Sequence, residues 1–203
     1  TAPHWPLQAP AETIDKYRGQ YDDGYDALAE KRLMSLEQIG LIEPGHIAPE
    51  QAYPETEFWN NLSDEQKQID AREMETYAAM VDNMDYHIGR VLDYLDASGQ
   101  RDNTIVIFIS DNGAQGFGPG MARAFPQDWI DENFDTSFEN IGKINSYAYL
   151  GPHWARASTA PMRMFKGFSS DGGLKVPAII SYPGKLEARA GTFTNQLTTV
   201  LDL

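Results

Sequence analysis

Cysteine is absent from this chain of 203 residues. Disulfide bonds, thiolate metal sites and a cysteine nucleophile are therefore excluded within these residues. No stretch approaches the roughly 18 consecutive apolar residues that a helix needs to cross a bilayer. Positive charge is also scarce, because sixteen Lys and Arg face thirty Asp and Glu, which gives a formal net charge of −14. This excess of negative charge opposes unassisted binding to nucleic acid or to an anionic membrane surface.

The residues that are present suit a globular protein. Hydrophobic residues make up 41% of the chain and include four Trp, which is enough to bury a sizeable core in one domain or in part of a larger one. The first residues show neither the basic nor the apolar region of a signal peptide. The chain opens at Thr1 without a methionine and closes on an apolar-rich segment, residues 198–203. We therefore expect it to be a piece of a longer protein.

One long helix is predicted over residues 63–99. Residues 63–66 (SDEQ) form the pattern of a capping box, and Gly99 is a suitable C-terminal stop. Between them, apolar residues recur at spacings of three and four: Tyr77, Val81, Met84, Ile88, Val91, Leu92 and Leu95. The acidic residues of the other face, which include Glu73, are interpreted as solvated surface. A further helix is indicated over residues 25–42, and the preceding Asp22 and Asp23 are interpreted as a surface turn.

The fold class predicted from these patterns is α/β. After the long helix, residues 104–110 (TIVIFIS) form a β-branched and nearly continuous apolar run. Such a run is typical of a strand that is covered on both faces in a parallel sheet. A second strand is predicted over residues 176–181, with Pro177 near its start. The aperiodic segment between them, residues 113–163, is rich in Gly, Pro and aromatic residues and is interpreted as a long ordered loop that forms a site.

Asp111 and Asn112 stand where the first predicted strand runs into a glycine-containing loop, a common place for chemistry in α/β folds. Carboxylate and amide oxygens favour a hard cation, calcium or magnesium, whereas zinc would more often require His or Cys. The tripeptide Asp-Asn-Gly is also a good turn after any strand. From the residues alone, the metal site and the plain turn stay equally open.

Two further residues are candidates for chemistry. His4 lies among Pro3, Pro6 and Pro10, so a stiff backbone holds an imidazole that could donate or accept a proton. Lys166 is a cation between aromatic residues and could neutralise an anionic substrate group. A structural histidine and a surface lysine are the alternatives, and the structural interpretation is stronger for His46, His87 and His153.

Residues 159–163 (TAPMR) have the spacing of a sulfatase nucleophile motif, with Thr159 in the place of the nucleophile. Because no obvious base lies nearby in the sequence, we interpret Thr159 as a packing residue.

Seven stretches together resemble the type I, formylglycine-dependent sulfatases, most closely the bacterial arylsulfatases. They run in family order across nearly the whole chain: residues 2–10 (APHWPLQAP), 108–114 (FISDNGA), 139–142 (ENIG), 145–147 (NSY), 159–161 (TAP), 165–167 (FKG) and 172–184 (GGLKVPAIISYPG). This order is far more specific than any single motif, and it favours the functional interpretation of His4, Asp111, Asn112 and Lys166.

The resemblance implies a mixed central sheet flanked by helices, the alkaline-phosphatase-like sulfatase fold. It implies that Asp111 and Asn112 supply part of the coordination of calcium, with magnesium the less favoured ion. It further implies that His4 and Lys166 act in catalysis and contact the sulfate group of a small-molecule sulfate ester, with His4 as the proton donor. The resemblance implies sulfate ester hydrolysis as the activity, with aryl sulfates as the expected substrates.

The resemblance also implies what this chain does not contain. The family's formylglycine arises in a Cys/Ser-x-Pro-x-Arg motif, and an Asp-Asp pair precedes that motif; both lie N-terminal to the segment that begins at His4. Residues 1–203 would thus be the central to C-terminal part of a sulfatase catalytic domain, inactive without the rest of the chain. Alternatives are a phosphonate or phosphate monoester hydrolase of the same superfamily, and a noncatalytic sulfatase-derived segment. The compartment, bacterial cytoplasm or periplasm, stays open.

Overall fold

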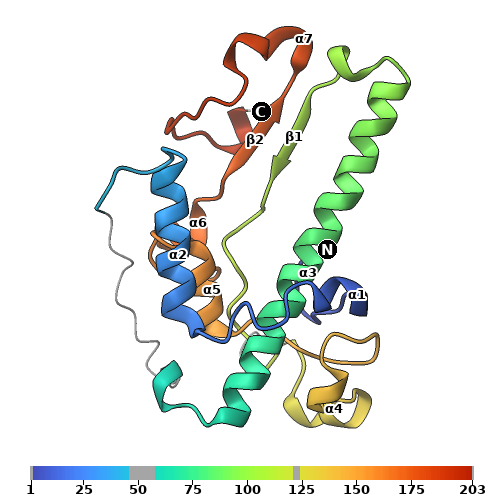
Figure 1. Ribbon diagram of the computed structural model, residues 1–203, viewed down its shortest axis with the longest axis vertical. Coiled ribbons are helices and arrows are strands. Elements are labelled where there is room, and N and C mark those ends of the chain that lie inside the picture. Colours follow the sequence, from blue (N-terminus) through green and yellow to red (C-terminus); the bar gives the residue numbers. More distant parts are fainter. Residues whose placement is uncertain (1, 46–57, 121–123, 203) are drawn as a thin grey trace.

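A computed structural model describes residues 2–45, 58–120 and 124–202 (Figure 1). The α-helices are α1 (Ala11–Asp15), α2 (Gly24–Gln38), α3 (Asp64–Ala97), α4 (Gln127–Asn133), α5 (Gly151–Thr159), α6 (Asp171–Leu174) and α7 (Pro183–Leu186). The strands are β1 (Val106–Ile109) and β2 (Ala178–Ser181). Short 3₁₀ turns cover Trp59–Asn61, Arg101–Asn103, Phe138–Asn140, Glu187–Arg189 and Val200–Asp202. No helix among these residues is long and apolar enough to span a membrane.

The long helix α3 confirms the prediction for residues 63–99. The Ser63 hydroxyl accepts a hydrogen bond from the Gln66 amide at 3.1 Å, which caps the first turn, and Gly99 follows the helix with a φ of +68°. Only the N-terminal half of α3 is deeply buried. Farther along, Val91 is 60% exposed whereas Ile88, Leu92 and Leu95 are half-buried, so the predicted apolar stripe is only partly covered there.

The sheet differs from the sequence prediction. Strands β1 and β2 pair antiparallel, with Val106 opposite Ser181 and Ile109 opposite Ala178. Ile107, Ile179 and Ile180 remain exposed. The prediction of a parallel strand covered on both faces is therefore wrong for the described residues. An apolar run favours a strand, but it does not determine the direction or the number of the neighbouring strands.

The main core lies where α2, α3 and α5 meet, with α2 packed along α5 (Figure 1). Trp154 is at its centre, 1% exposed, and its ring makes edge contacts with Tyr21, Tyr25 and Trp59. Its indole N–H donates to the Asp70 carbonyl at 3.0 Å, which links α5 to α3. Helices α4 and α5 both fall within residues 113–163, so the prediction of an uninterrupted loop there is wrong.

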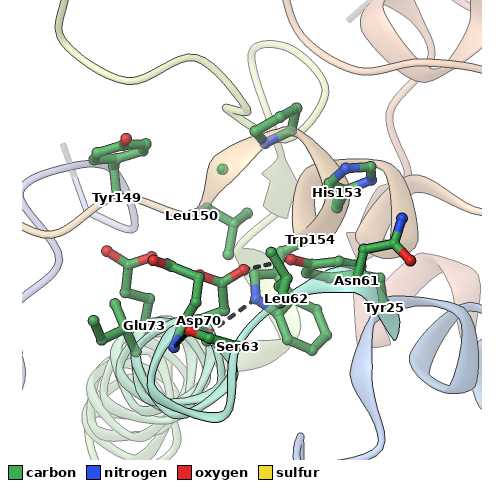
Figure 2. A pocket seen from close by; sticks show the side chains of 14 residues that line it. Tyr25, Asn61, Leu62, Ser63, Asp70, Glu73, Tyr149, Leu150, His153 and Trp154 are labelled. Carbon is green, nitrogen blue, oxygen red and sulfur yellow. Dashed lines mark hydrogen bonds between the residues drawn. The ribbon is translucent and has the colours of Figure 1, made fainter. Parts of the chain in front are cut away.

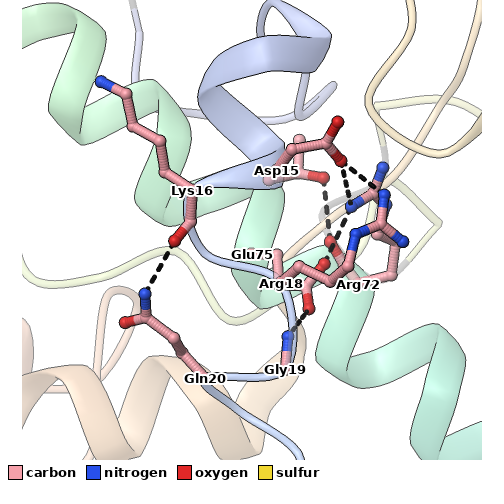
Figure 3. Close-up of polar contacts among 8 residues, drawn as sticks. Asp15, Lys16, Arg18, Gly19, Gln20, Arg72 and Glu75 are labelled. Carbon is pink, nitrogen blue, oxygen red and sulfur yellow. Dashed lines mark hydrogen bonds and ion pairs between the residues drawn. The ribbon is translucent and has the colours of Figure 1, made fainter.

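Polar contacts tie the N-terminal region to α3 (Figure 3). Arg72 forms ion pairs with Glu75 at 2.9 Å and with Asp15 of α1 at 4.0 Å. The Gly19 amide donates to the buried Glu75 carboxylate at 2.7 Å. Farther toward the N-terminus, the Leu7 amide donates to the carbonyl of Ala148 at 2.9 Å. These bonds fix the segment that carries His4.

Candidate functional site

His4 is half-buried and held by its neighbour Trp5. The His4 Nδ1 atom lies 3.2 Å from the Trp5 carbonyl oxygen, and the two rings lie 4.7 Å apart between centroids. The Trp5 indole donates to the Phe117 carbonyl at 3.1 Å. Because a carbonyl can only accept, Nδ1 carries the hydrogen and Nε2 is left for a second partner.

That second partner is Lys166. Its Nζ lies 3.3 Å from Nε2 of His4, so residues 162 positions apart are brought into contact. An ammonium can only donate, which agrees with a neutral His4 that has its hydrogen on Nδ1. The Lys166 amide donates to the Ala114 carbonyl at 3.0 Å, so the backbone of the lysine is fixed against the loop that follows β1. The two residues predicted to contact an anionic group therefore lie side by side.

Asp111 and Asn112 lead out of β1 into the same loop. Asp111 is exposed and Asn112 is half-buried. The Asn112 side-chain amide donates to the Gly113 carbonyl at 2.9 Å, which leaves its side-chain oxygen able to accept. A carboxylate and an amide oxygen fit a hard cation such as calcium. Two adjacent donors make only part of such a site, and the described residues contain no group of three or more His, Cys, Asp or Glu that could hold a metal.

Close backbone contact joins this loop to the segment after Lys166. The Gly113 amide donates to the Gly173 carbonyl at 3.2 Å. A Cβ atom on Gly113 would lie 1.7 Å from the Gly172 carbonyl oxygen, and one on Gly172 would lie 2.0 Å from that of Met164. Only glycine fits at these two positions, because backbone atoms of the neighbouring segment occupy the space that a Cβ atom would fill. The close approach fixes the Asp111–Asn112 loop next to the segment that carries Lys166.

Thr159 has a structural role, as predicted. It is 5% exposed at the end of α5, and its hydroxyl lies 2.7 Å from the Met164 carbonyl and 3.0 Å from that of Arg156. The hydroxyl is thus buried, and its partners are backbone carbonyls that cannot take its proton, which agrees with a packing role.

The other histidines also follow the structural interpretation where they can be described. His153 is 6% exposed and stacks on Tyr25, and His87 is an exposed residue of α3 beside Arg90. His46 lies outside the described residues. Asp22 and Asp23 are exposed before α2, in agreement with a surface turn.

A second polar site was missed from the sequence. Glu73 is half-buried rather than solvated, so that interpretation is wrong, and with Asp70 it lines a cavity of about 730 Å³ between α3 and the start of α5 (Figure 2). Burial, and then the nearby Asp70 carboxylate, raise the pKa of Glu73 well above its ordinary value of 4.5. The only sequence signal was a pair of acids three residues apart, which solvated helix faces also contain.

The geometry brings a histidine and a lysine into contact and joins the lysine backbone to the loop that carries Asp111 and Asn112 after a strand. Over residues 1–203 the chain matches the family model described as Sulfatase. The chain belongs to the sulfatase family, and its described residues combine α-helices with a two-stranded sheet.

Two curated relatives are similar to the chain. An uncharacterized sulfatase of Schizosaccharomyces pombe is 45% identical over 206 residues, which cover 100% of this chain and 36% of the relative. An arylsulfatase of Klebsiella aerogenes is 38% identical over 188 residues, which cover 91% of this chain and 39% of the relative. The chain thus spans less than half the length of these relatives.

A solved structure, described as Ps i-CgsB in complex with k-i-k-neocarrahexaose, is 18% identical, with a TM-score of 0.33. The match covers 84% of this chain and 36% of the other.

Proposed function

We propose that the protein to which this chain belongs hydrolyses sulfate esters, and that this chain contributes the residues that contact the sulfate group. The contact of 3.3 Å between Lys166 and His4 carries the proposal, because it puts a cation and a proton-transferring ring at one point. Membership of the sulfatase family and the 38% identity to an arylsulfatase support it. We propose aryl sulfates as the substrates.

His4 and Lys166 have separate roles in this proposal. The Lys166 ammonium offsets negative charge on the sulfate oxygens, and its contribution grows as charge develops on the leaving oxygen. His4 presents Nε2 to that oxygen, while the Trp5 carbonyl holds Nδ1–H and so fixes the ring orientation. In the structure Nε2 accepts from Lys166, so for His4 to act as the acid Nε2 would first have to take up a proton, which would then pass to the leaving phenol or alcohol oxygen.

Asp111 and Asn112 would hold part of a calcium site in the same proposal, with magnesium as the less favoured ion. Calcium, when bound, would polarise a sulfate oxygen and so make the sulfur a better electrophile. The remaining ligands and the formylglycine nucleophile would come from the rest of a longer chain, since residues 1–203 contain no Cys/Ser-x-Pro-x-Arg motif.

Replacement of Lys166 in the longer enzyme tests the proposal. Lys166→Ala should lower kcat for para-nitrophenyl sulfate by about 10²- to 10³-fold, equivalent to about 2.7–4 kcal/mol, with an unchanged melting temperature. Lys143→Ala is the matched control, because Lys143 is an exposed lysine on a different loop. Unchanged turnover in Lys166→Ala would leave a noncatalytic, sulfatase-derived protein as the better interpretation.

The same assay separates sulfate from phosphate chemistry. Both groups are tetrahedral, so the His4–Lys166 pair alone does not choose between them. We expect kcat/KM for para-nitrophenyl sulfate to exceed that for para-nitrophenyl phosphate. The reverse order would favour a phosphate or phosphonate monoester hydrolase of the same superfamily.

A further inference from the structure

The cavity between α3 and the start of α5 shares no residue with the proposed sulfate site. Its volume is about 730 Å³, and its wall includes side chains from α2, α3 and α5 (Figure 2). Two of its fourteen lining residues are carboxylic acids and none is lysine or arginine. An anion such as a sulfate ester does not suit this wall.

The two acids differ from three other acids of the N-terminal half of the chain. Asp15, Asp26 and Glu75 each form an ion pair with an arginine. Among the residues that the structure describes, no such pair includes Asp70 or Glu73. Like charges three residues apart on a helix repel each other, so the cavity wall carries negative charge that lacks a cationic partner.

Neutral donors fix Asp70 in place. One carboxylate oxygen accepts from the Tyr25 hydroxyl, and the other accepts from the Gln66 side chain at 2.7 Å. Glu73 accepts a backbone hydrogen bond from Tyr149, whereas a carboxylate can accept about four. Glu73 therefore retains capacity to accept hydrogen bonds from a ligand.

Aromatic rings complete the wall. Tyr25, Tyr149 and Trp154 all line the cavity. Tyr25 stacks on His153 with 4.7 Å between centroids and meets Trp154 edge-on at 4.7 Å, so these rings are held by one another. Tyr25 and Trp154 are 4% and 1% exposed, so the half-buried Tyr149 is the ring of the three that can face a ligand, and an aromatic face beside a desolvated carboxylate attracts a cation.

We propose that this cavity binds an organic cation, a guanidinium or ammonium group on an apolar body, with Glu73 as its principal anionic partner. A planar guanidinium or amidinium would donate two hydrogen bonds to the Glu73 carboxylate while its apolar part packs against Tyr149. The proposal is independent of sulfate ester hydrolysis.

Binding of benzamidinium to the 203-residue chain tests the proposal by calorimetry and by quenching of tryptophan fluorescence. We expect saturable binding that is about 10- to 100-fold weaker in Glu73→Gln, because one hydrogen-bonded charge pair is lost. Glu65→Gln, an exposed glutamate in the first turn of the same helix, is the matched control and should leave the affinity unchanged. Absence of saturable binding, or equal affinity in Glu73→Gln and the wild-type chain, would overturn the proposal.

Two kinds of cation fit the cavity: one on a free small molecule, or the side chain of an arginine or lysine from elsewhere in a longer chain. The longer protein distinguishes them. If benzamidinium binds both the 203-residue chain and the longer protein, the cavity is a small-molecule site. Binding to the 203-residue chain alone, together with a lower melting temperature of Glu73→Gln in the longer protein, identifies a side chain that fills the cavity. No binding to either form contradicts the proposal.

Discussion

Replacement of Gly113 tests whether the backbone contact behind Asp111 and Asn112 holds the candidate site together. In the structure a Cβ atom at this position would lie 1.7 Å from the Gly172 carbonyl oxygen, although real Cβ contacts under 3.0 Å are essentially never seen. The two segments must therefore move apart by roughly an ångström in Gly113→Ala. Gly113 does not have a positive φ, so the expected effect is steric and not a matter of backbone conformation.

Overpacking of this kind costs about 1–3 kcal/mol. In a chain of this size each kcal/mol lowers the melting temperature by about 2–4 °C, so Gly113→Ala should melt about 2–12 °C below the wild-type chain. Differential scanning calorimetry of the 203-residue chain measures the change directly. Because the movement would also displace Asp111 and Asn112, turnover in the longer enzyme should fall even where that protein remains folded.

Gly89→Ala provides the matched control. Gly89 lies within α3 and has no atom within 4 Å of the added Cβ. Alanine is favoured over glycine by about 0.5–1 kcal/mol in a helix interior, so this variant should melt slightly above the wild-type chain. Equal melting temperatures for Gly113→Ala and the wild-type chain would refute the close packing of Gly113 on Gly172.

Three further predictions concern α3. Ser63→Ala removes the N-terminal cap and should cost about 1 kcal/mol in the free energy of unfolding, measured with urea, whereas Ser35→Ala within α2 should be neutral or stabilising. Arg72→Ala leaves the buried Glu75 carboxylate without its cation and should cost about 3 kcal/mol; a loss below 1 kcal/mol would argue against this pair as an anchor. Because the pKa of Glu73 is raised in the folded state, the folded chain binds more protons there, and stability falls as pH rises above 4.5 toward the folded pKa. The melting temperature of Glu73→Gln should therefore exceed that of the wild-type chain at pH 8 and match it at pH 4; a constant difference would contradict the raised pKa.

Local sequence signals predicted the local structure well. Ser63 and Gln66 predicted the start of α3, and Gly99 predicted its end, because capping and a positive φ depend on a few neighbouring residues. The second strand begins at Ala178, directly after Pro177, as the missing amide of proline indicated.

The long-range structure was harder to predict from the sequence. The apolar run that contains β1 did not reveal its antiparallel partner, since strand direction is set by connections elsewhere in the chain. Helix α5 was missed because it is only nine residues long and begins with Gly151 and Pro152, which are more typical of a loop. Glu73 was interpreted as surface because nothing in its own segment shows that Tyr149 lies opposite.

The candidate site was predicted only in part. Family order along the chain indicated His4, Asp111, Asn112 and Lys166 as a set. The structure places His4 against Lys166 and fixes the lysine backbone to the loop after Asn112. Metal binding by Asp111 and Asn112 stays a prediction.

The contact between His4 and Lys166 also has a consequence for folding. It closes a loop of 162 residues, about four-fifths of the chain, and the entropic cost of closing so long a loop must be offset by the packing of the intervening helices. Local opening at either end separates the two side chains while the core around Trp154 stays intact. The site is therefore expected to lose its geometry before the protein loses its fold, and hydrogen exchange at the Leu7 and Lys166 amides should report that earlier event.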